Sequence, residues 1–169
     1  MSFKPPKITV KLTDKGMAKS VAAMFGKRAA YVKVGVFGDK GAEQAAKGAL
    51  DMAALAAVHE FGLGNNPERS FLRSYIDANE VKLRKMLLVL MEKEIGRAVK
   101  SGRPITDSDR KRVLEKLGLV MVAGIQERIA NGEITPPLTE QTIARKGSST
   151  PLVDTGQLRS SISHEVELG

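Results

Sequence analysis

The chain has 169 residues, no cysteine and a formal net charge of +8 at neutral pH. This length suits one domain around a single core, and the lack of cysteine excludes disulfides, thiolate metal sites and a cysteine nucleophile. Aromatic residues make up only 4% of the chain, which argues against a base-stacking platform for single-stranded nucleic acid.

The positive charge is concentrated in the first part of the chain, because residues 1–40 carry +7 of the total. Within them we define a basic arm, residues 1–30, whose candidate contact residues are Lys4, Lys7, Lys11, Lys15 and Lys19. Such an arm can meet an acidic protein neighbour, which we favour, or the phosphates of DNA. The first residues lack the apolar region of a secretory signal, and the longest apolar run, 117–125, is too short to span a bilayer. We therefore expect a soluble protein made in a cytoplasm, without membrane contact.

The first third of the chain predicts two strands separated by a helix. Residues 8–12 alternate apolar and polar side chains, which indicates a short edge strand. A helix capped by Asp14 and stopped near Gly26 follows. Residues 31–37 then predict a strand whose three valines share one face, and residues 38–41 supply its turn.

The middle of the chain predicts three helices. The first covers residues 49–61 and ends at Gly62 in the left-handed conformation. The second begins at Asn66-Pro67-Glu68 and runs to Lys100, about 50 Å at 1.5 Å per residue. The third begins at a capping box of Thr106 and Asp109 and closes at residues 131–132. The two long amphipathic helices should pack as an antiparallel hairpin, and Gly124 should let a neighbouring backbone approach the second of them closely.

The last part predicts a short helical patch at 139–145, a surface loop at 146–151, a turn capped by Asp154 and a final strand ending near residue 168. The whole chain, 1–169, is therefore predicted to be a single α+β domain. Its small antiparallel sheet packs with two long amphipathic helices that form a hairpin.

Several short patterns suggest chemistry, but each has a simpler interpretation. Asp154-Thr155-Gly156 is the tripeptide of aspartic proteases, whose all-β fold conflicts with long helices, so capping is favoured. His59-Glu60 lacks the second histidine that a zinc-protease helix needs four positions later. The basic residues at 82–100 are interspersed with Glu80, Glu92 and Glu94, which favours a solvated face over nucleic-acid binding. We predict no catalytic residue, no metal site and no cofactor.

Three patches in a fixed order remain distinctive: residues 56–62, 67–73 and 151–162. Together they resemble the tail-completion proteins of tailed bacteriophages, also called head–tail joining, neck or virion-morphogenesis proteins. In that family a glycine-ended helix precedes a loop of the form Pro-x-Arg-x-Phe-Leu-Arg, then a long helix, then a late Leu-x-Asp-Thr-Gly-x-Leu-Arg-x-Ser-Ile segment. Ser70 stands where family members often have a second proline, and residues 92–112 lie outside the matched motifs. The motif and interface residues that the resemblance carries over are Glu60, Gly62, Pro67, Arg69, Phe71, Arg73, Asp154, Thr155, Gly156, Leu158 and Arg159.

The resemblance implies a structural virion protein and not an enzyme. Such a subunit forms a homo-oligomeric ring between the head connector and the tail, around the channel through which DNA passes. Its partners would be the connector and the tail terminator or tube, with possible non-specific contact to channel DNA, and it would reside in the virion neck after assembly in the host cytoplasm. A tail-terminator or head-closure ring subunit is the alternative within the particle, and a non-specific DNA-binding protein is the alternative of another class.

Overall fold

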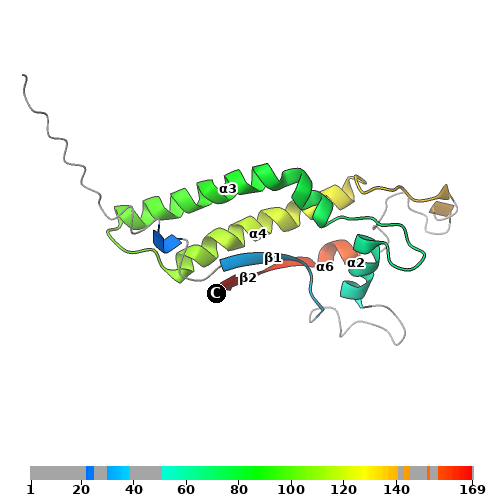
Figure 1. Cartoon of the computed structure of the whole chain (residues 1–169), viewed down its shortest axis with the longest axis horizontal. Helices are drawn as coiled ribbons and strands as arrows, with labels where there is room; N and C mark the ends of the chain where they lie inside the picture. Colours follow the sequence, from blue (N-terminus) through cyan, green and yellow to red (C-terminus); the bar gives the residue numbers. More distant parts are fainter. Residues whose placement is uncertain are drawn as a thin grey trace, which may run out of the picture.

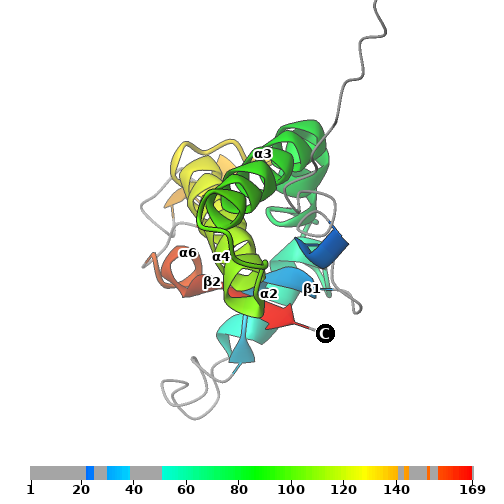
Figure 2. The same ribbon diagram turned by 90° about the vertical axis from the view of Figure 1, so that its left-hand side faces the viewer.

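The computed structural model describes residues 22–24, 30–38, 51–140, 143–144, 152 and 156–168. In chain order the elements are β1 (Ala30–Val36), α2 (Met52–Phe61), α3 (Arg73–Lys100), α4 (Asp107–Ala130), α6 (Gln157–Ser161) and β2 (Ile162–Leu168). The helix α4 lies between α3 on one side and the two strands on the other, with α2 and α6 side by side at one end (Figures 1 and 2). The predicted α+β class, with a small antiparallel sheet and a hairpin of two long helices, is confirmed.

The two strands pair antiparallel, with Ala30 opposite Leu168 and Val36 opposite Ile162. The three valines of β1 pack against the core as predicted, because alternate side chains of a strand point to opposite faces. The other face of β1 carries the exposed Tyr31 and Lys33, which both contact the Glu167 carboxylate on β2. The sheet therefore buries one face and exposes a polar one.

The helical hairpin follows most of the predicted boundaries. The capping box at Thr106 and Asp109 is present, and α4 ends at Ala130 with Asn131 as its C-cap. The long helix α3 ends at Lys100 as predicted, but the prediction of its start at Pro67 is wrong, because α3 begins at Arg73. With 28 residues, it is about 42 Å long rather than 50 Å.

Two glycines of α4 allow other side chains to come unusually close to the helix. A Cβ atom at Gly124 would lie 2.1 Å from the hydroxyl oxygen of Tyr75 on α3, and one at Gly118 would lie 2.4 Å from the ring of His164 on β2. The close approach predicted at Gly124 is thus made by an aromatic side chain and not by a backbone. These two positions bring both neighbouring layers against α4.

The buried side chains form two clusters. The larger one joins α2, α3, α4, α6 and the strands, and includes Phe71, Ile125 and Ile129. The smaller one lies at the closed end of the hairpin, where Met24 meets Val113 and Ala98. None of the helices in the described ranges is long and apolar enough to cross a membrane.

Several predicted features lie outside the described residues. They are the strand at 8–12, most of the basic arm with its five lysines, the loop at 146–151, Asp154 and Thr155, and part of the helical patch at 139–145. The last short helix, α6, has its N-cap at Gly156. This position is two residues after the aspartate for which the sequence predicted capping.

Candidate functional site

The chain reverses sharply at the end of α2. Gly62 closes the helix in the left-handed conformation, with φ of 63°, and its N–H donates to the Val58 carbonyl. A Cβ atom here would lie 2.6 Å from the backbone nitrogen of Glu68, so only glycine meets both the conformation and the space. The predicted role of Gly62 is confirmed.

The Glu60 side chain, in the last turn of α2, extends to the start of α3. Glu60 is buried, with 3% of the residue's surface exposed. It accepts from the backbone N–H groups of Phe71, Leu72 and Arg73 at 2.8, 2.9 and 3.0 Å. These amides precede or begin a helix and have no partner within it. Glu60 therefore caps α3 from another helix.

This capping explains why the predicted helix start was wrong. Asn66 does not cap α3; its amide donates to the Leu63 carbonyl in a turn instead. The Ser70 hydroxyl donates to the Glu60 carboxylate at 2.7 Å. Ser70 also accepts from the Ser74 N–H, so its side chain adds to the cap.

The Glu60 carboxyl is held in its charged form. Burial alone would raise its pKa, but the hydrogen bonds from Leu72, Arg73, Ser70 and Phe71 outweigh burial, so the pKa lies below its ordinary value. A carboxylate that accepts several backbone N–H bonds is stabilised relative to its acid.

Arg73 fastens the same junction from the solvent side. Its guanidinium donates to the Glu60 carboxylate at 3.0 Å, to the Glu60 carbonyl at 2.9 Å and to Glu68 at 2.8 Å. The guanidinium carbon also lies 4.8 Å from the centre of the Phe61 ring, within the range of a cation–π contact. One side chain thus ties the end of α2 to the start of α3.

Arg69 and Phe71 attach the loop to the rest of the fold. The buried Arg69 guanidinium donates to the carbonyls of Pro136 and Pro137, at 2.9 and 3.2 Å, in the segment after α4. Phe71 is fully buried in the larger core cluster. Pro67 is exposed, and begins the loop without joining the hydrogen-bonded centre.

The third patch joins the first two through α6. Leu158 is buried in the same cluster as Ala56 and Phe71, and α6 contacts α2. Gly156 is the N-cap of α6, with φ of 76°. Arg159 is exposed, and its carbonyl accepts from the Gln126 amide at 3.0 Å. The structure therefore brings all three sequence patches together, in their described parts.

The surface beside this junction is apolar and hollowed. A cavity of about 530 Å³ lies between β1, α2 and α3, with Ala53, Ala57, Leu72 and Ile76 among its lining residues. Phe61 and Leu63, 54% and 50% exposed, stand at the end of α2. Sequence reasoning missed this surface, because exposure depends on how the elements pack.

The junction's polar groups are engaged with one another, and their hydrogen bonds hold together the end of α2, the start of α3 and the segment after α4. Among the described residues, no set of three histidine, cysteine, aspartate or glutamate side chains is arranged to hold a metal ion. Comparison with known protein families, with curated protein sequences and with solved structures found no match to this chain.

Proposed function

We propose that this chain is a structural subunit of the neck of a tailed bacteriophage. In this role it joins the head connector to the tail and packs with copies of itself in a ring around the DNA channel. It works through its shape and surfaces, as an assembly protein and not as an enzyme.

The observation that carries the proposal is the convergence of the three patches on which the resemblance to tail-completion proteins rests. The third patch follows the first two only after the whole α3–α4 hairpin, yet Glu60, Arg73 and Leu158 belong to one junction of α2, α3 and α6. Because residues of all three patches build one junction, the fold gives a structural reason for the three patches to occur in the same chain. This supports the resemblance as a feature of the fold rather than of chance similarity.

The surface at this joint also favours assembly. The cavity and the exposed Phe61 and Leu63 form an apolar area, and large exposed apolar side chains beside a hollow are typical of protein interfaces. Ring subunits need such a surface because each heterologous contact must bury apolar area on two neighbours.

Three other roles make different demands on the fold and its surface. A tail-terminator or head-closure subunit needs the same kind of interface, and is distinguished by whether the protein copurifies with free tails or with filled heads. An aspartic protease needs its aspartate in an all-β fold, which the α+β fold does not favour. A DNA-binding protein needs a cationic surface, and its affinity falls steeply as salt rises.

The proposal is tested by deleting the gene for this chain from its phage and examining the lysate by electron microscopy. We expect separate heads and tails, and restoration of complete virions when the wild-type gene is supplied. Complete, DNA-retaining, tailed particles in the absence of the chain would overturn the proposal.

Complementation with point variants tests the assembly surface separately. Leu63→Glu places a charge beside the joint, whereas Leu88→Glu makes the same change on the exposed face of α3, at similar exposure. With both variants folded, as judged by circular dichroism, we expect Leu88→Glu to restore virions and Leu63→Glu to fail. Equal restoration by both would remove the joint as the assembly surface.

A further inference from the structure

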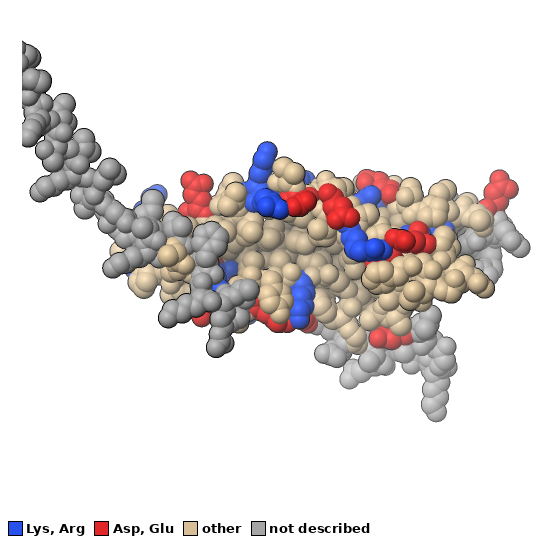
Figure 3. Space-filling model, in the orientation of Figure 1, with Lys and Arg blue, Asp and Glu red and all other residues tan. Residues whose placement is uncertain are grey.

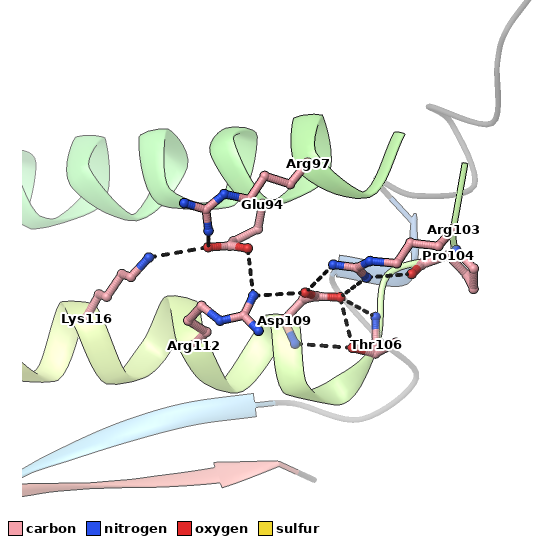
Figure 4. Close-up of polar contacts among 8 residues, drawn as sticks. All are labelled: Glu94, Arg97, Arg103, Pro104, Thr106, Asp109, Arg112 and Lys116. Carbon is pink, nitrogen blue, oxygen red and sulfur yellow. Dashed lines mark hydrogen bonds and ion pairs between the residues drawn. The ribbon is translucent and has the colours of Figure 1, made fainter. Parts of the chain in front are cut away.

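Two buried carboxylates hold a set of cations at the closed end of the hairpin (Figure 4). Glu94 of α3 accepts from Arg97 at 2.7 Å, Arg112 at 2.9 Å and Lys116 at 3.3 Å. Asp109 of α4 accepts from Arg103 through both guanidinium nitrogens, at 2.6 and 2.9 Å, and from Arg112 at 3.1 Å. Both carboxylates are 1% exposed, so the expected solvated position of Glu94 is wrong.

The pairing leaves an excess of positive charge. Four cations surround two carboxylates, and the pKa of each carboxyl is lowered. Burial raises the pKa of Glu94, but the hydrogen bonds from Arg112 and Lys116 outweigh burial. The main cause of the lowered pKa of Asp109 is its hydrogen bonding to Arg103. The cationic side chains remain 38% to 49% exposed, while the anions are hidden. Solvent therefore meets the cations and not their partners.

Two further lysines extend this surface. Lys93, Arg97 and Lys100 are spaced four and three residues apart on α3, which places them on one side of the helix, and both lysines are exposed. We call the resulting set of six residues the cationic cluster: Lys93, Arg97, Lys100, Arg103, Arg112 and Lys116.

The nearby acidic residues do not neutralise the cationic cluster. Asp107 pairs with Arg110 at 2.9 Å, and Glu115 pairs with His164 on β2 at 2.7 Å. Glu92 is two positions from Glu94, about 200° around the helix, and so faces away from the hairpin seam. The six cations of the cationic cluster and the two buried carboxylates, Glu94 and Asp109, together carry a net charge of about +4.

We propose that the cationic cluster binds the phosphodiester backbone of duplex DNA. The buried carboxylates restrict the arginine side chains, so less conformational entropy is lost when they bind a ligand. Guanidinium groups with free N–H donors match phosphate oxygens in geometry and charge. Lys93 and Lys100 are about 10 Å apart along the helix axis, a length over which a duplex presents several phosphates.

A phosphate backbone fits this surface better than an acidic protein. A stable protein interface needs a buried apolar centre, whereas the cationic cluster consists of six charged side chains. Its biological setting, DNA passing through the particle, rests on the proposed function, but its DNA affinity is a property of the purified chain. For the basic arm the sequence favoured an acidic protein neighbour over DNA, and the cationic cluster is a separate surface built from other residues.

The test measures binding of the purified full chain to fluorescently labelled duplex DNA at several salt concentrations. Lys93→Gln/Lys100→Gln removes two cations of the cluster but leaves the ion pairs of Glu94 and Asp109 intact. The control, Arg84→Gln/Lys85→Gln, removes the same charge from exposed positions of α3 that lie about 12 Å or more from Lys93 along the helix axis. Along α3, basic and acidic side chains are interspersed on the face seen in Figure 3. Circular dichroism establishes that each variant is folded.

We expect the slope of log affinity against log salt to fall by about 1.8 in the cluster variant, since each phosphate contact contributes about 0.9. The control should keep the wild-type slope. Equal slopes in the two variants, or no duplex binding by the wild type, would overturn the inference. The inference would also be overturned if polyglutamate bound as tightly as the duplex and lost as much affinity in the cluster variant. The cationic cluster would then recognise acidic proteins. None of these results bears on the deletion phenotype, which tests the neck role independently.

Discussion

Replacing Glu60 by glutamine is expected to destabilise the whole fold, although it replaces only one carboxylate oxygen by an NH₂ group. The carboxylate accepts five hydrogen bonds, three from the backbone at residues 71–73 and two from the side chains of Ser70 and Arg73. One oxygen receives two of them and the other receives three. The amide of glutamine has one acceptor oxygen, and its NH₂ group would face donors in place of the other.

The magnitude follows from the donors left without an acceptor. In the better orientation of the amide, the N–H groups of Phe71 and Leu72 lose their acceptor, and each unsatisfied buried donor costs about 1–3 kcal/mol. The lost ion pair with the half-exposed Arg73 adds little, because surface pairs contribute about 0–1 kcal/mol. We therefore expect Glu60→Gln to lower the free energy of unfolding by about 2–6 kcal/mol.

The assay is urea unfolding of the purified chain, followed by circular dichroism. Glu68→Gln is the matched control, because it removes another carboxylate that binds Arg73 but is 57% exposed. It should cost about 0.5 kcal/mol or less. A loss in Glu60→Gln no larger than in this control would refute the capping role of Glu60.

Three further predictions concern other parts of the fold. Gly124→Ala should lower the free energy of unfolding by about 1–3 kcal/mol, since the new methyl group meets Tyr75. Gly96→Ala, in open space within α3, should instead raise it by about 0.8 kcal/mol; thermal unfolding of both distinguishes them, and equal effects would contradict the close packing. Acid should destabilise the chain because the pKa of Glu94 is lower in the folded state than its ordinary 4.5. Its contribution is complete above about pH 4.5 and is lost as the pH falls through the folded value. The melting temperature should therefore decline below that pH, and less steeply in Glu94→Gln; identical slopes would contradict this. Arg69→Met should cost about 1–3 kcal/mol by leaving two carbonyls without their donors, and unchanged urea stability would contradict the anchoring role.

The sequence was most informative where local patterns determine structure. The alternation at 31–37, the left-handed Gly62 and the capping box of Thr106 and Asp109 all depend on neighbouring residues, and the structure confirms them. The hairpin followed from two long apolar stripes joined by a short connection. Such features carry their physical cause within a few residues.

Features that depend on distant residues were missed. The start of α3 was misplaced because Asn66-Pro67 is a good local helix start, yet Glu60 supplies the cap from another helix. Glu94 was assigned to solvent because its neighbours are charged, although its partners Arg112 and Lys116 lie on α4. A glutamate two residues before a helix-ending glycine is a local signal that pointed toward the junction.

If the proposed function holds, cryo-electron microscopy of virions from the tailed phage proposed to encode this chain tests it most directly. We predict a closed ring of copies between connector and tail, with each α3–α4 hairpin recognisable in the density and its cationic end facing the DNA. A neck whose density is fully occupied by other chains would contradict the proposed role.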